Sequence, residues 1–168
     1  GRGHLRAIIG EHGIGKSRLA YEINQYLIQN QDIEIIHCQC DQILKKPFNP
    51  FIYYLKNYFK QLSEASGAHN LDNFNLQFDL LVEKLYVHHE TELMNELKRI
   101  KSIFLAMLGV FSSDSLWEML DAKGRYENTK IAIHILIKSL ARIRPVMILI
   151  EDAHWCDESS LQVVHEFI

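Results

Sequence analysis

The stretch that decides the fold is Leu5 to Leu27, which reads LRAIIGEHGIGKSRLAYEINQYL. The apolar run from Leu5 to Ile9 predicts a β-strand. Apolar side chains then recur at helical spacing and predict a helix with one apolar face, formed by Leu19, Ala20, Ile23 and Leu27. A strand, a glycine-rich turn and a helix in this order indicate an α/β fold.

The eight residues between the predicted strand and helix fit the pattern G-x-x-x-x-G-K-[ST], the phosphate-binding loop of nucleoside triphosphatases. Gly10, Gly13 and Gly15 allow positive φ and close backbone approach, so consecutive amides can point at phosphate oxygens. The loop runs into a helix N-terminus, whose free N–H groups and dipole favour an anion. Lys16 would supply positive charge to the β and γ phosphates, and the Ser17 hydroxyl would bind Mg²⁺. A plain glycine-rich turn is the alternative, and the flanking strand and helix disfavour it.

A second stretch, Pro145 to Asp152, is a continuous apolar run that ends in two carboxylates, Glu151 and Asp152. This pattern predicts a buried parallel strand with acidic groups at its C-terminal edge, where open α/β sheets bind ligands. Because the phosphate loop also follows a strand, we expect the acids to meet the phosphates. Their chemistry would be Mg²⁺ coordination and orientation of the attacking water. The alternative is a strand that simply ends in solvated acids.

Length and composition set broad limits. The 168 residues suit one domain, and 48% hydrophobic with 23% charged residues is ordinary for a globular protein. A net charge of -3 gives no indication of nucleic-acid binding. The three cysteines, an odd number without framework spacing, fit a reducing cytoplasm. We find no apolar run of membrane-spanning length and no signal peptide.

Both ends of the sequence look cut. The first residue is Gly1 rather than Met, and Ile168 lies inside an amphipathic run. We therefore expect residues 1–168 to be part of one domain in a longer, multidomain protein.

The chain between the two motifs is predicted to be mainly helical. Ile33 to Cys40 reads as a strand, and Asn49 is expected to cap a helix that starts at Pro50. Helical patterns run from about 74 to 108, with a short helical turn at about 116–120. The Ile131 to Ile137 segment alternates like a strand, but its length favours a helix. Near the end, Asp157 is expected to be the N-cap of another helix.

With both motifs quoted, the chain resembles the P-loop ATPase domain of the signal-transduction (STAND) group. More narrowly, it resembles the AAA-type domain found in large regulators beside class III cyclase, serine/threonine kinase or MalT-like helix-turn-helix domains. The resemblance is carried by Gly10 to Leu19, Glu22, Cys38, Pro47 to Phe51 and Ile148 to Leu161. It spans nearly the whole chain, although the middle, roughly Leu62 to Arg125, matches only as a helical insertion.

The resemblance implies a three-layer sandwich with a parallel sheet, ATP and Mg²⁺ as cofactors, and a slow ATPase that acts as a conformational switch. The implied partners are ATP or ADP and effector domains of the same polypeptide, with an oligomer possible and no nucleic acid or membrane expected. The implied catalytic residues are Lys16, Glu151 and Asp152, and the implied Mg²⁺ ligands are Ser17 and Glu151. The implied nucleotide-binding residues are Gly10, Glu11, His12, Gly13, Ile14, Gly15, Lys16, Ser17 and Arg18.

The sequence departs from this family pattern at three points. His12 and Cys156 stand where small residues are common, which we expect to alter little. Glu151 stands where many relatives have Asp, so either Glu151 touches the Mg²⁺ shell and Asp152 polarises water, or the roles are reversed. Finally, such folds carry a sensor strand after the acid strand, beyond Ile168, so we expect residues 1–168 alone to be less stable and a poor ATPase.

Two functions compete with the ATPase switch. A small-molecule kinase would need an acceptor pocket and lid arginines, which the helical middle does not obviously supply. A binding-only module would hold nucleotide without cleaving it and use its helices for docking.

Other candidate residues have simpler interpretations. The clusters His37 to Cys40 and His88 to Glu90 lack the spacing of zinc sites, which favours core cysteines and surface histidines. Trp155 is expected to pack on the following helix rather than on adenine. Arg18 and Arg125 are candidate phosphate contacts, with solvated arginine as the default.

Overall fold

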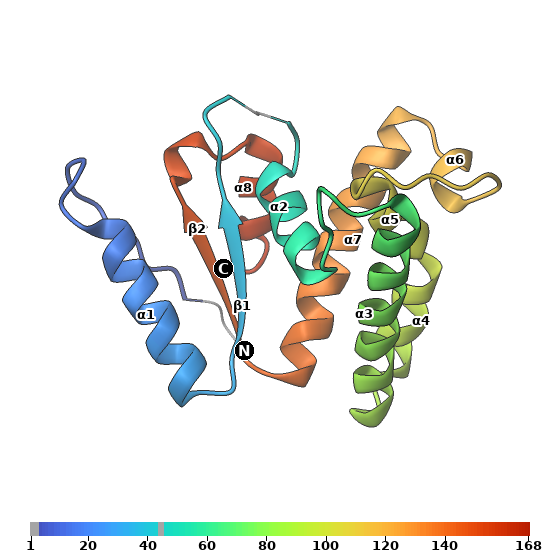
Figure 1. The fold of residues 1–168 in the computed structure, drawn as a ribbon, viewed down its shortest axis with the longest axis horizontal. Coiled ribbons are helices and arrows are strands. Elements are labelled where there is room, and N and C mark those ends of the chain that lie inside the picture. Colours follow the sequence, from blue (N-terminus) through green and yellow to red (C-terminus); the bar gives the residue numbers. More distant parts are fainter. Residues whose placement is uncertain (1–3, 44–45) are drawn as a thin grey trace.

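The computed structural model describes residues 4–43 and 46–168, and its sheet consists of two parallel strands (Figure 1). β1 (Glu34–Gln39) pairs with β2 (Val146–Glu151) in a continuous register, from Glu34 opposite Val146 to Gln39 opposite Glu151. The strands predicted within Ile33 to Cys40 and Pro145 to Asp152 are thereby confirmed, and the small parallel sheet is consistent with an α/β fold. Since the two strands point the same way, the residues that follow them lie at one edge.

The predicted strand at Leu5 to Ile9 is wrong, because this segment has no regular secondary structure. Leu5 and Ile9 are 62% and 92% exposed, although both are apolar. An isolated extended segment gains no ladder hydrogen bonds, and neither described strand pairs with it. β2 is likewise half-buried rather than buried, because among the described residues only β1 flanks it. The three-layer sandwich therefore remains a prediction.

Helices make up most of the remaining chain. They are α1 (Lys16–Asn30), α2 (Asn49–Tyr58), α3 (Gly67–Val87), α4 (Thr91–Arg99), α5 (Lys101–Met107), α6 (Leu116–Met119), α7 (Ala122–Ile143), the 3₁₀ helix η1 (Ala153–Trp155) and α8 (Glu158–His165). The predicted helical insertion is confirmed, because α2 to α7 all lie between β1 and β2 in the sequence. The ambiguous segment from Ile131 to Ile137 lies within α7 and is helical, as its length favoured.

Polar caps explain where several helices begin. The Ser66, Asp121 and Asp157 side chains accept hydrogen bonds from backbone N–H groups three residues ahead and start α3, α7 and α8. The prediction for Asp157 is confirmed, whereas Asn49 is the first helical residue and not the cap. The N-cap of α2 is Phe48, in the left-handed region with φ 62°. This geometry buries the Phe48 ring and lets its N–H donate to Asp157 Oδ1 at 3.0 Å.

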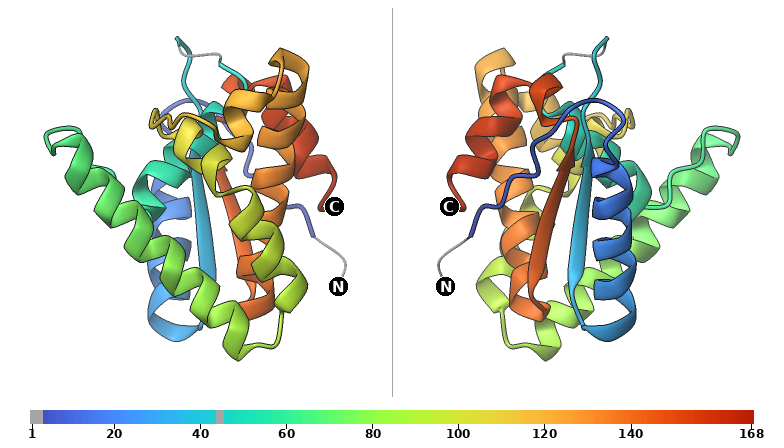
Figure 2. Two further views of the ribbon diagram at one scale, coloured as in Figure 1. Left: turned by 90° about the vertical axis from the view of Figure 1, so that its right-hand side faces the viewer. Right: turned by 90° about the vertical axis from the view of Figure 1, so that its left-hand side faces the viewer.

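The core lies on one side of the sheet. Ile36 and Cys38 of β1 are fully buried, and Figures 1 and 2 show α2 and α7 beside the sheet, with α3, α4 and α5 farther out. Phe59 joins the layers, because its ring centroid lies 4.5 Å from that of Phe74 and 6.0 Å from that of Phe104. The helical insertion therefore builds its own aromatic core against β1.

Candidate functional site

The glycine-rich loop has the backbone geometry that close phosphate approach requires at two of its three glycines. Gly13 and Gly15 have φ of 83° and 99°, a region that favours glycine. Gly10 does not have a positive φ, so the loop does not use the conformational freedom that was predicted at this glycine. A Cβ at Gly10 would instead lie 3.1 Å from Cγ2 of Ile14, so this position keeps the loop tightly closed.

The first turn of α1 follows the loop without a capping side chain. Its N-cap is Gly15, which has none to offer, so free N–H groups of the turn face the loop. Lys16 bends back over the loop, and its Nζ donates to the carbonyl oxygens of Gly10 at 2.8 Å and Glu11 at 2.7 Å. Amides and an ammonium group thus converge on one exposed loop, which is an arrangement suited to an anion.

The remaining predicted loop residues are open to solvent. Glu11, His12 and Ile14 are exposed, and so is Ser17. The Arg18 guanidinium is paired with Glu22 Oε1 at 2.5 Å, one helical turn farther along α1. Arg18 therefore points along the helix surface in this structure.

The two acids lie at the C-terminal edge of the sheet. Glu151 is the last residue of β2, and its side chain is 25% exposed, with Oε1 3.7 Å from Nε2 of His37. Asp152 adopts a left-handed conformation with φ 53°, which is uncommon for a residue other than glycine. Its Oδ2 accepts a hydrogen bond of 3.1 Å from Nε2 of Gln39. The Asp152 carboxylate is therefore hydrogen-bonded to a side chain of β1, and the Glu151 carboxylate lies near another.

The structure brings the acids together with His37 and Gln39, and it places the phosphate loop at the same end of the molecule (Figure 1). Within residues 4–43 and 46–168, no hydrogen bond or ion pair joins Lys16 or Ser17 to Glu151 or Asp152. The loop and the acids therefore lie at the same end of the molecule, with no polar contact between these four side chains among the described residues.

His37 and Gln39 are site residues that sequence analysis missed. The His37 to Cys40 cluster lacks the spacing of a zinc site, and no role was predicted for Gln39. Their positions two apart on β1 carried a signal, because alternate residues share one face of a strand. Only the register, which sets Gln39 opposite Glu151, connects that face to the acids.

The oxygen donors of the loop and of the sheet edge suit Mg²⁺ rather than a thiolate-bound metal. Ser17 offers a hydroxyl oxygen and Glu151 a carboxylate oxygen, the hard ligands that Mg²⁺ prefers. Burial raises the pKa of the Cys40 thiol to about 12 and raises that of Cys38, so both resist becoming thiolates. Both cysteines are buried, as expected. His88 and His89 are exposed, also as expected.

Arg125 has a structural role in place of the candidate phosphate contact. Its Nε donates to the carbonyl of Trp117 at 3.1 Å, and its guanidinium lies 5.2 Å from the centroid of the Trp117 ring. Trp155 follows the two acids closely in the sequence. The centroid of its ring lies 4.8 Å from the centroid of the His154 ring.

None of the helices in the described parts of the chain is long and apolar enough to cross a membrane.

Comparison with known proteins identifies the family. Neither the curated proteins nor the solved structures gave a match. The family model described as an AAA ATPase domain matches residues 1–168, the entire chain. The loop, the paired acids and this match lead to one conclusion: the chain belongs to the AAA ATPase domain family.

Proposed function

We propose that this chain binds ATP with Mg²⁺ and, in the intact protein, hydrolyses it slowly as a conformational switch. The observation that carries the proposal is the uncapped N-terminus of α1 behind Gly13 and Gly15, with Lys16 as its first residue. Membership of the AAA ATPase domain family supports nucleotide as the anion. A plain structural turn would have no need for an uncapped helix end and an ammonium group held over it.

In the proposed complex the loop amides and the start of α1 hold the β and γ phosphates. Lys16 exchanges its contacts with the Gly10 and Glu11 carbonyls for phosphate oxygens, which offer full negative charge instead of a dipole. The exposed residues His12, Ile14 and Arg18 flank the nucleotide.

The acids are proposed to handle the metal and the water. Ser17 and Glu151 would hold Mg²⁺, which neutralises phosphate charge when bound. Asp152 would orient the attacking water, and the Gln39 amide would fix the direction of its carboxylate. The reverse division between Glu151 and Asp152 is the alternative.

The proposed context is a larger cytoplasmic regulator. Residues 1–168 would form part of a P-loop ATPase domain of the signal-transduction group, and the nucleotide state would control an effector domain of the same polypeptide. Cyclase, kinase and transcription-regulator domains are the effectors that the resemblance suggests.

The test is calorimetric titration with ATP and ADP, with and without Mg²⁺. Wild-type protein should bind both nucleotides, and Lys16→Ala should reduce binding below detection because the phosphates lose their main cation. Lys123→Ala, a change of an exposed lysine on α7, is the matched control and should bind as wild type does. Equal affinity of Lys16→Ala and wild type would show that the loop assignment is wrong.

Turnover by the intact protein distinguishes the proposed switch from its competitors. In the intact protein, Asp152→Asn should keep nucleotide affinity and lose phosphate release, since an amide cannot accept the proton of water as a carboxylate can. A kinase would release ADP only with an added acceptor. A binding-only module would show no turnover with either side chain.

A further inference from the structure

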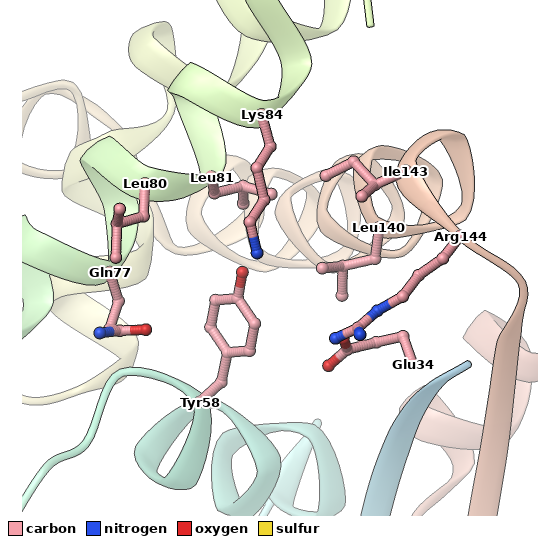
Figure 3. A pocket seen from close by; sticks show the side chains of 9 residues that line it. All are labelled: Glu34, Tyr58, Gln77, Leu80, Leu81, Lys84, Leu140, Ile143 and Arg144. Atoms are coloured by element: carbon pink, nitrogen blue, oxygen red, sulfur yellow. The ribbon is translucent and has the colours of Figure 1, made fainter. Parts of the chain in front are cut away.

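A polar cavity lies far from the acid edge of the sheet. It has a volume of about 170 Å³ and opens among α2, α3 and α7, beside Glu34, the first residue of β1 (Figure 3). Glu151 marks the opposite end of the sheet, as the last residue of β2. Six residues of strand span roughly 20 Å, so this cavity is separate from the proposed nucleotide site.

One pair of charges in the cavity wall is already neutralised. Arg144 Nε donates to Glu34 Oε2 at 3.0 Å, and its Nη2 contacts the same oxygen. The Tyr54 hydroxyl donates to the other carboxylate oxygen at 3.3 Å, and Arg144 Nη1 also reaches Asp32. Glu34 and Arg144 therefore satisfy each other and leave little charge for a ligand.

Three donors in the cavity wall, the Lys84 ammonium, the Tyr58 hydroxyl and the Gln77 amide, have no hydrogen bond to the described residues. The Lys84 ammonium and the Tyr58 hydroxyl point toward one another in Figure 3. In the described part of the chain neither group has a hydrogen bond, and Lys84 has no ion pair. Burial and the nearby Glu34 carboxylate raise the pKa of Tyr58, so its hydroxyl keeps its proton. An anionic oxygen placed between them would accept a hydrogen bond from each.

An apolar part of the cavity wall comes from α3, which also carries Lys84, and from α7. Leu80, Leu81, Leu140 and Ile143 form it. We propose that the cavity binds a small monocarboxylate with a short hydrocarbon body, its carboxylate between Lys84 and Tyr58 and its chain against the leucines. A phosphate dianion fits less well, because only one cation is unpaired and the Glu34 carboxylate lies in the same wall.

The experiment is an NMR titration of the protein with butyrate, observed through ¹³C-labelled leucine and isoleucine methyl groups. Butyrate should shift the methyl signals of Leu80, Leu81, Leu140 and Ile143 saturably, with a dissociation constant in roughly the millimolar range expected of so small a ligand. Butyramide, which has the same shape without the charge, should bind at least about tenfold more weakly. ATP should leave these butyrate shifts unchanged, because the two sites are separate.

Two variants test the assigned donors. Lys84→Gln should weaken butyrate about tenfold, and Tyr58→Phe should weaken it by a smaller factor, about threefold. Lys56→Gln, an exposed lysine on α2, is the matched control and should bind as wild type does. Lys84 is exposed, so its variant should fold, which thermal melting verifies. Absence of saturable shifts, equal binding of butyramide, tighter binding of inorganic phosphate, or an unchanged affinity in Lys84→Gln would overturn the proposal.

Discussion

The N-terminal unit (residues 4–30) and the helical unit (residues 46–143) contrast sharply in how they bury apolar side chains. In α1 only Ala20 is buried, and Leu19 and Tyr26 are 51% and 61% exposed. In the helical unit Phe59 and Phe104 are fully buried in an aromatic cluster. The proposed phosphate loop thus belongs to the weakly packed unit.

The contrast indicates which unit stabilises the fold. Burying a large apolar side chain contributes about 1.5–3 kcal/mol, and the helical unit does this many times while α1 hardly does so. Segments with few buried contacts open locally at low free-energy cost. The loop and α1 should therefore respond most to nucleotide, whereas the aromatic core of the helical unit should remain unchanged.

The largest expected effect comes from the centre of the helical unit. Phe59→Ala should lower the free energy of unfolding by about 3–5 kcal/mol, because it removes a ring that contacts both Phe74 and Phe104. Urea denaturation measures the change. Ile9→Ala in the N-terminal unit is the control, and it should shift stability by less than about 0.5 kcal/mol since Ile9 is 92% exposed. If both variants lowered the free energy of unfolding by similar amounts, the two units would not differ in how strongly they stabilise the fold.

A medium effect is expected at the cap of α8, which joins the helical unit to the acid edge. Asp157 Oδ1 accepts from the N–H groups of Ser160 at 2.9 Å and Phe48 at 3.0 Å, and Oδ2 accepts from the Ser160 hydroxyl at 2.7 Å. Asp157→Ala should cost about 2 kcal/mol, because it removes a cap and leaves a second N–H without its partner.

The matched control for Asp157→Ala is Ser115→Ala. Ser115 caps only the short helix α6, through a bond of 3.4 Å to the Glu118 N–H. This change should cost about 0.5 kcal/mol, at the low end for caps. If urea denaturation gives the same loss of unfolding free energy for the two variants, the hydrogen bond from the Phe48 N–H to Asp157 contributes nothing to stability.

Local signals predicted the structure well where neighbouring residues alone decide it. Asp157 was recognised as a cap because capping involves residues three apart, and the length of the run around Ile131 to Ile137 was enough to identify α7. Prediction failed where distant partners decide. The strand at Leu5 to Ile9 needed a neighbour, and Phe48 replaced Asn49 as the cap of α2 through a contact with Asp157.

The candidate site was predicted to a similar degree. The motif identified Lys16, Ser17, Glu151 and Asp152, whose roles remain predictions. Gln39 was missed because its bond to Asp152 joins residues 113 apart and depends on strand register. No local pattern contains that information.

The smallest expected effect is an electrostatic one between α7 and the C-terminal end of α8. Glu166 contacts Lys130 Nζ at 2.5 Å and His134 Nε2 at 2.8 Å, and the hydrogen bond from Lys130 lowers the pKa of the Glu166 carboxyl. A carboxyl with a lowered pKa stabilises the fold above its unfolded pKa, and this contribution disappears as the pH falls through the folded value. Glu166→Gln should therefore be slightly less stable than wild type at neutral pH, and the difference should vanish in acid.

Thermal melting from about pH 7 down to about pH 2 measures this difference. Glu64→Gln, in the exposed loop before α3, is the control and should follow wild type at every pH. A gap between Glu166→Gln and wild type that widened in acid would contradict the assigned direction of the pKa shift.

The pairing of β1 with β2 also has a consequence for how the chain folds. Glu34 lies opposite Val146, so the ladder joins segments more than a hundred residues apart, while the helices between them form largely from local contacts. Closing so long a loop costs conformational entropy, and that cost falls once the intervening chain has become compact. The helical insertion should therefore condense first and bring the strands together, which makes the edge that carries Glu151 and Asp152 one of the last parts of the molecule to form.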